Sequence, residues 1–237
     1  MRIFLRAVTG WEYDVHGRSF PVVIVTISWQ LGIDGERVGA LLGERLGVPV
    51  VDGEVVDAVM HALRTGRADA AEMERFVPTW GANLAVSLLA TAGMPAARAD
   101  VIRAECAHTA VEAVIREAAK HSCVIMGRGG FAILADHPGA CHVRLTAPAD
   151  WRRGRLAACE CLPAEQAERR IESDDRNRAA FVRHYHHRAI DDPANFHLVL
   201  AAERFRPDEL VEVIATAATH GVAAQGAPLP AAVSQPV

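Results

Sequence analysis

The feature that most constrains this fold is an apolar, β-branched run that leads into a glycine-containing loop and then a helical pattern. Residues 22–27 have the composition of a buried strand, and residues 38–47 have the apolar spacing of a helix that ends at Gly47. This layout presents backbone N–H groups and the helix dipole to a phosphate. The loop departs from G-x-x-x-x-G-K-[ST], because Trp29 occupies the first glycine position and no lysine follows. The sequence therefore predicts a phosphate-binding layout without its usual lysine.

Strand and helix patterns alternate along the rest of the chain. Further strands are predicted at residues 48–51, 122–127, 142–146 and 196–201, and further helices at 54–64, 99–120, 150–158, 164–183 and 207–219. This alternation predicts an α/β fold of three layers (α/β/α), with a parallel sheet covered by helices on both faces.

The 237 residues fit one large domain with flanking segments. We expect a lead-in over 1–20, the main domain over 21–220, and a disordered Ala-, Pro- and Gln-containing tail over 221–237. Within the main domain we expect an inserted helical lobe over about 54–120 and an arginine-bearing lid region over about 150–192.

Composition limits the classes of partner. The net charge of −4 predicts no broad nucleic-acid surface, and no apolar run reaches the ~20 residues needed to span a membrane. Lys120 is the only lysine, so a phosphate held by a side-chain cation would be held mainly by arginine. The five cysteines include no C-x-x-C pair, and residues 1–10 are too interrupted by arginine for a signal peptide. These features are typical of a cytoplasmic protein with reduced thiols.

Three segments together resemble the cytidylate kinase-like branch of the P-loop nucleoside monophosphate kinases, over roughly residues 22–214. They are the altered phosphate loop at 26–35 (commonly I-S-R-Q-L-G-S-G-G), the strand and loop V-I-M-G-R-G at 124–129, and the lid and closing strand at 175–181, 191–193 and 198–200. The resemblance implies a P-loop NTPase fold, and transfer of a phosphoryl group from ATP, with Mg²⁺, to a nucleoside monophosphate. CMP or dCMP is the first candidate acceptor.

The resemblance implies that the phosphate loop binds the donor through Ser28, Gly32, Asp34 and Gly35. Gly35 stands at the lysine position, so Arg37 is the candidate catalytic cation. The carboxylate of Asp34 opposes phosphate binding unless it holds Mg²⁺. Two alternatives remain open: the loop is a turn before a helix without a ligand, and Ser28 caps a turn rather than binding metal.

On the acceptor side, Arg128 follows a buried strand and therefore emerges at the carboxyl edge of the sheet, where open α/β folds bind ligands. The resemblance implies that Arg128 contacts the acceptor phosphate and that Asp52 contributes to the acceptor site. A surface salt bridge is the alternative for Arg128. Gly53 and Ala58 stand where the cytidylate kinase pattern has a serine and an arginine, which leaves pyrimidine specificity open.

In the lid, Asp175 and Arg178 are spaced i,i+3 on a predicted helix and so share one face. The resemblance implies that they recognise a pyrimidine acceptor, and that Arg176 and Arg178 neutralise charge during transfer; a simple intrahelical ion pair is the alternative. Arg170 and Arg183 are further cations nearby.

Two questions remain open at the level of sequence. Three histidines lie within residues 184–187, where a metal cluster is an alternative, and no metal ligand is assigned. The competing function is a catalytically inactive, nucleotide-binding or structural relative of the kinases, which Trp29, Asp34 and the missing lysine favour. The expected partners are ATP and a small phosphate acceptor, and oligomeric state is not readable.

Overall fold

The computed structural model describes residues 7–8, 11–13, 19–57 and 104–222. Its strands are β1 (Ala7–Val8), β2 (Trp11–Tyr13), β3 (Ser19–Pro21), β4 (Ile24–Trp29), β5 (Val50–Val51), β6 (Cys123–Met126), β7 (Ala140–Thr146) and β8 (Leu198–Ala201). Its helices include α1 (Gly35–Leu46), α5 (Ala104–Ala118), α6 (Gly130–Ile133), α7 (Ala149–Glu160), α8 (Ala164–His186) and α9 (Pro207–Thr216). Residues 53–57 are also helical.

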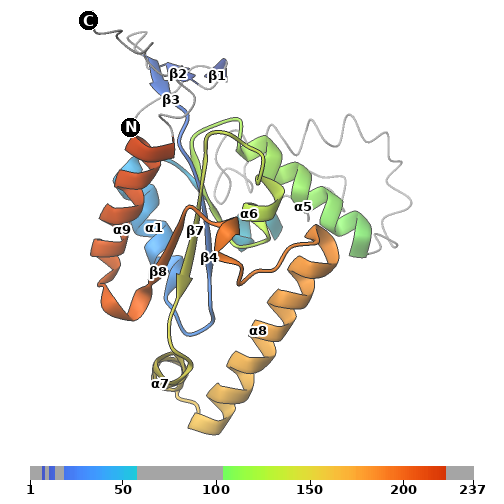
Figure 1. The fold of residues 1–237 in the computed structure, drawn as a ribbon, viewed down its shortest axis with the longest axis vertical. Coiled ribbons are helices and arrows are strands. Elements are labelled where there is room, and N and C mark those ends of the chain that lie inside the picture. The colour runs from blue at the N-terminus through green and yellow to red at the C-terminus, as the bar shows by residue number, and fades with distance from the viewer. Residues whose placement is uncertain (1–6, 9–10, 14–18, 58–103, 223–237) are drawn as a thin grey trace, which may run out of the picture.

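The main sheet has five parallel strands in the order β5-β6-β4-β7-β8. Figure 1 shows α1 and α9 on one side of this sheet and α5 and α6 on the other, which confirms the predicted three-layer α/β fold. The helices α7 and α8 lie beyond the end toward which β4 and β7 point (Figure 1). Side chains at the carboxyl ends of the strands therefore face α7 and α8.

The two faces of the central strands differ in polarity. Val25 and Ile27 of β4 belong to an apolar cluster with Val143 of β7 and with side chains of α1 and α9. On the opposite face, β4 carries Thr26 and Ser28, and β7 carries His142 and Arg144; all four are buried. Strands covered on both faces are usually apolar throughout. These polar positions therefore mark the face on which to look for a site.

The first helix has defined ends. The Asp34 carboxylate accepts a hydrogen bond from the backbone N–H of Arg37 and caps α1. At the other end Gly47 adopts φ 68°, and its N–H donates to the carbonyls of Gly43 and Glu44. The glycine ending was predicted from the sequence, whereas the short helix α6 was not, because four residues are too few for a periodic pattern.

Outside the main sheet, β1, β2 and β3 form a small antiparallel sheet within the predicted lead-in. Most of the predicted lobe, including Ala58, and residues 223–237 of the predicted tail lie outside the described residues. Cys141, Cys159 and Cys161 form no disulfide with any other described residue. Among the described helices, none combines the length and apolar character needed to cross a bilayer.

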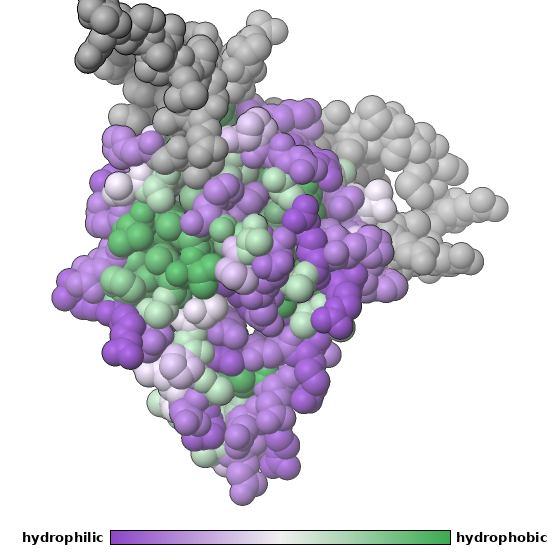
Figure 2. All heavy atoms as spheres, viewed as in Figure 1, coloured by the Kyte–Doolittle hydropathy of each residue, from purple (hydrophilic) through white to green (hydrophobic). Residues whose placement is uncertain are grey.

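Figure 2 shows hydrophobic residues gathered on the side of the molecule that α9 and β8 occupy. The large hydrophobic side chains exposed in this part of the chain are Val199, Phe205 and Val213. Because β8 pairs only with β7 among the described strands, it is an edge of the sheet. The opposite edge strand, β5, pairs with β6, which is the strand that leads into the second glycine loop at residues 127–130.

Candidate active site

The phosphate loop between β4 and α1 uses several of its own polar groups. The N–H of Ile33 donates to the carbonyl of Gln30 at 3.1 Å, and the N–H of Gly35 donates to the carbonyl of Ile33 at 2.8 Å. Asp34 contributes its carboxylate as the cap of α1. The N–H of Gly32, by contrast, donates to no acceptor among the residues that the structure describes. Of the predicted donor-binding positions, Gly32 thus offers an available amide, whereas Gly35 and Asp34 are already engaged.

The indole of Trp29 packs between the two glycine loops. A Cβ at Gly35 would overlap the indole, and a Cβ at Gly127 would lie 3.6 Å from it. The guanidinium of Arg178 stacks over the same ring at 5.5 Å and donates from Nη1 to the Trp29 carbonyl at 3.3 Å. Arg178 also pairs with Asp174 at 2.5 Å, one helical turn away. Trp29 therefore lies over the first turn of α1, and it holds α8, the helix that bears Arg178, against this turn.

A buried arginine lies beneath this loop. Nη1 of Arg144 donates to the Ser28 hydroxyl at 2.8 Å, and Nη2 donates to Asp191 at 3.0 Å. Burial lowers the pKa of Arg144 and the nearby Asp191 carboxylate opposes that shift, so the guanidinium remains the charged form. Its Nε is buried without a partner among the described residues. Ser28 therefore accepts a hydrogen bond from a side chain rather than capping a turn.

The same face carries a buried imidazole. His142 Nδ1 lies 2.9 Å from the Thr26 hydroxyl. Burial, and the neighbouring His197, lower the pKa of His142 to about 4, so the ring is neutral at physiological pH. A polar column thus runs along β4 and β7 up to the carboxyl edge of the sheet.

Arg152 of α7 connects the lid to the phosphate loop. It donates to both oxygens of Asp175, at 3.2 and 2.8 Å, and to the carbonyls of Ala147 and Leu31. Gly32, at φ 92°, makes room for this helix: a Cβ there would lie 2.7 Å from the Arg152 carbonyl oxygen. Asp175 thus pairs with Arg152 rather than with Arg178, and the intrahelical pair considered from their spacing is absent.

The second glycine loop holds Arg128 in an unusual conformation. Gly127, Arg128 and Gly129 have φ values of 66°, 51° and 73°, so three successive residues are left-handed. A non-glycine residue pays about 1–2 kcal/mol for this conformation. The guanidinium is half-exposed and pairs with Asp57 at 3.2 Å. Strain of this kind often accompanies a functional position.

Gly53 has a structural role beside Arg128. A Cβ at Gly53 would lie 3.2 Å from Nη2 of Arg128, so the missing side chain leaves room for the guanidinium. Asp52 caps the helical residues 53–57 by accepting from the N–H of Val55 at 3.0 Å. Asp52 caps this segment and Arg128 pairs with Asp57 at its end, so both predicted acceptor-site residues contact residues 53–57.

The remaining predicted residues lie at the surface. Arg176 pairs with Glu172, Arg170 pairs with Glu160, and Arg183 is exposed. Arg37 is exposed, and its side chain forms no ion pair with any described residue. The structure thus brings Ser28, Asp175 and Arg178 to the phosphate loop, but it leaves Arg37 and Arg176 pointing to solvent.

Sequence reasoning missed Arg144 and Arg152. Arg144 lies between the apolar Val143 and Leu145 near the carboxyl end of a buried strand, which is itself a signal that its guanidinium has a buried partner. Arg152 had no such signal, because it is one of several arginines on a polar helix. Only the tertiary arrangement separates it from its exposed neighbours.

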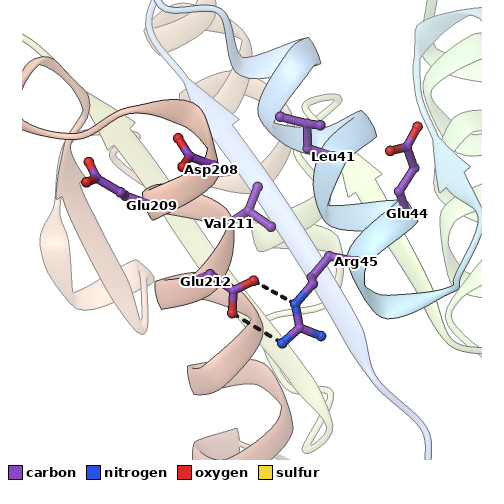
Figure 3. A pocket seen from close by; sticks show the side chains of 7 residues that line it. All are labelled: Leu41, Glu44, Arg45, Asp208, Glu209, Val211 and Glu212. Carbon is purple, nitrogen blue, oxygen red and sulfur yellow. Dashed lines mark hydrogen bonds and ion pairs between the residues drawn. The ribbon is translucent and has the colours of Figure 1, made fainter.

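A surface hollow lies apart from these residues. Figure 3 shows it between α1 and α9, lined by Leu41, Glu44, Arg45, Asp208, Glu209, Val211 and Glu212. Arg45 there is paired with Glu212 at 2.6 Å, and most of the remaining charge is acidic. An acidic hollow on the second half of α1 does not suit a phosphate, so the candidate active site is the carboxyl edge of the sheet.

Comparison with protein-family profiles matches residues 24–204 to the cytidylate kinase-like family. The chain belongs to this family. The match covers both glycine loops, the lid helices and β8, and so confirms the resemblance drawn from the motifs. A search of curated proteins found no match.

Solved structures with the same fold include a protein of Eubacterium ventriosum ATCC 27560 described as uncharacterized. It is 18% identical, with a TM-score of 0.58 over 81% of this chain and 95% of that chain. A shikimate kinase from Bacteroides thetaiotaomicron is 15% identical over 82% of this chain and 94% of its own, with a TM-score of 0.43. A shikimate kinase from Acinetobacter baumannii in complex with shikimate is 13% identical over 82% and 92%, with a TM-score of 0.41.

Proposed function

We propose that this chain transfers the γ-phosphoryl group of ATP to a nucleoside monophosphate, with CMP or dCMP as the first acceptor to test. The observation that carries the proposal is Arg128, held in a strained conformation between two glycines at the carboxyl edge of the sheet. Catalysis of phosphoryl transfer depends mainly on positioning and charge stabilisation. A half-exposed guanidinium suits an incoming phosphate, because its surface partner Asp57 can be exchanged at little cost.

On the donor side, the N–H of Gly32 and the start of α1 would contact the ATP phosphates. Arg37 is exposed and has no ion-pair partner among the described residues, so it is available to replace the usual lysine. Mg²⁺ bound with ATP would neutralise phosphate charge, and the oxygen ligands that it prefers are present in the Asp34 carboxylate and the Ser28 hydroxyl. For Asp34 to serve, its carboxylate must turn from the α1 cap toward the donor.

On the acceptor side, Arg128 would hold the monophosphate, with Asp52 and Asp175 near the base. The lid cations Arg176 and Arg178 would close over the transferring group. Arg176 has only an exposed partner, so it can reorient readily. Cys141, Cys159 and Cys161 form no disulfide within the described part of the chain, which supports a cytoplasmic setting.

A second candidate is a relative that binds nucleotide without transferring phosphate. Two observations favour it: the Asp34 carboxylate sits on the helix terminus, and the Trp29 indole covers Gly35. Both oppose entry of a phosphate into the loop. Neither affects Arg128, which lies in the other glycine loop.

The test is to incubate the purified chain with Mg-ATP and a panel of nucleoside monophosphates and to measure ADP. The proposal predicts acceptor-dependent ADP that is lost in Arg128→Ala and retained in Arg45→Ala, an exposed arginine that pairs with Glu212 in the hollow apart from the site. Thermal stabilisation by Mg-ATP with no ADP for any acceptor would favour the second candidate. The absence of both effects would refute both.

A further inference from the structure

The cluster of His108, Glu112 and His186 is a site that the proposed function does not use. His108 and Glu112 lie one turn apart on α5, and His186 ends α8, where Figure 1 shows these two helices approaching each other. His108 Nε2 lies 3.7 Å from Glu112 Oε1, and His186 Nδ1 lies 3.9 Å from the same oxygen. One ligand atom from each residue falls within 4.8 Å of the others.

These distances fit a transition-metal ion. With Zn–N and Zn–O bonds of 2.0–2.2 Å, two ligands of a tetrahedral site lie about 3.4 Å apart. The separations of 3.7 and 3.9 Å from the Glu112 oxygen are close to this value, and no pair of ligand atoms in the cluster is more than 4.8 Å apart. Side-chain rotations that draw the two imidazoles together would complete the geometry. Two imidazoles and one carboxylate favour Zn²⁺ over Mg²⁺ or Ca²⁺, which prefer oxygen ligands alone.

The surrounding residues hold the three ligands in place. The His186 side chain is 4% exposed, and its Nε2 packs against Gly129, where a Cβ would lie 2.5 Å away. This contact leaves Nδ1 facing Glu112. The ring of His108 stacks on Tyr185 at 4.2 Å, which fixes its plane. Glu112 is 31% exposed and opens the cluster to solvent, so a water molecule can complete the coordination.

We propose that His108, Glu112 and His186 form a structural site for Zn²⁺ or a similar divalent transition metal. The ion would join α5 to the end of α8 beside the 127–129 loop. Its role would be to hold the base of the lid region against the loop that bears Arg128. The inference stands on this geometry and does not depend on phosphoryl transfer.

The test uses the tag-free full chain, stripped of metal with a chelator and titrated with Zn²⁺ by calorimetry and with Co²⁺ by visible absorption. The wild type should bind one equivalent, show the absorption bands of tetrahedral cobalt, and melt at a higher temperature with Zn²⁺. Glu112→Gln, which preserves side-chain shape, and His186→Gln should each weaken binding by more than about tenfold.

His184→Gln is the matched control, because His184 is exposed on the same helix and outside the cluster. It should leave affinity unchanged. Melting curves without metal establish whether each variant folds, and the isosteric Glu112→Gln keeps the test informative if His186→Gln does not. The proposal is wrong if the wild type binds no stoichiometric metal, if Glu112→Gln binds as tightly as wild type, or if His184→Gln abolishes binding.

Discussion

The glycine loops that follow the neighbouring strands β4 and β6 differ in the charged side chain that each carries and in whether that side chain is engaged within its own loop. After β4, the Asp34 carboxylate caps the helix and the Trp29 indole covers Gly35. After β6, Arg128 stands between two left-handed glycines with an exposed partner. The first loop is stabilised by its own groups, whereas the second carries backbone strain and a charge that a ligand can take over.

The difference indicates where this family member is constrained by function and where by folding. Groups that make their contacts within the chain are explained by stability alone, whereas strain at a half-exposed cation is not. Arg144 and Arg152 extend the first pattern, since both are buried and donate to groups of the phosphate loop or the lid. The comparison can be tested at each loop separately.

The largest effect is expected on the first loop from Arg152→Met. The change removes the bonds to Leu31 and Ala147 and leaves Asp175 without its partner. Because Asp175 is one-third exposed and can be rehydrated, we expect a loss of about 2 to 3 kcal/mol in the free energy of unfolding, measured by denaturant titration. Arg153→Met, at the adjacent half-exposed surface position, should cost less than about 1 kcal/mol. Equal losses in the two variants would show that Arg152 does not brace the loop.

A similar or smaller loss is expected from Gly35→Ala. The added Cβ overlaps the Trp29 indole, and overpacking of this kind costs about 1–3 kcal/mol. Combining it with Trp29→Ala should remove most of the additional loss, which a double-mutant cycle measures directly. Gly154→Ala is the control: with no atom within 4 Å in α7, it should stabilise the chain by about 0.5–1 kcal/mol. Strict additivity of the two loop substitutions would contradict the contact.

The smallest effect on stability, with opposite sign, is expected at the second loop from Arg128→Gly. Glycine accepts φ 51° without the Cβ penalty, so the free energy of unfolding should rise by about 1 kcal/mol while ADP formation is lost. Arg128→Ala removes the same guanidinium but keeps the Cβ, and it should show no such rise. A loss of stability in Arg128→Gly would mean that the Asp57 pair, rather than backbone strain, dominates at this position.

Local sequence patterns predicted the sheet and most of the helices. The β-branched run at 22–27 and the ending at Gly47 depend on neighbours in sequence, so they could be read directly. The pairing of Asp175 could not, because its partner Arg152 comes from a different helix. Gly53 illustrates the same limit. The sequence shows only that it replaces the serine of the cytidylate kinase pattern, whereas the structure shows that it makes room for Arg128.

The candidate site was predicted in part for the same reason. Arg128 and the phosphate loop are positioned by single strand-to-loop junctions, which motifs capture. The contacts of Arg144 with Ser28 and of Trp29 with Gly127 join residues that are far apart in the sequence. Local patterns therefore could not predict them. The roles predicted for all of the site residues, Arg37, Arg176 and Asp52 among them, stay predictions.

The Asp34 carboxylate that caps α1 competes with any phosphate for the N–H groups at the start of this helix. A carboxylate on the same chain is present at a high effective concentration that dilution does not change. Any phosphate that approaches this helix terminus must displace Asp34, and its affinity then reflects the difference between two anions rather than the strength of one. The loop is therefore expected to admit only those ligands whose remaining contacts, on the lid or at Arg128, outweigh that exchange.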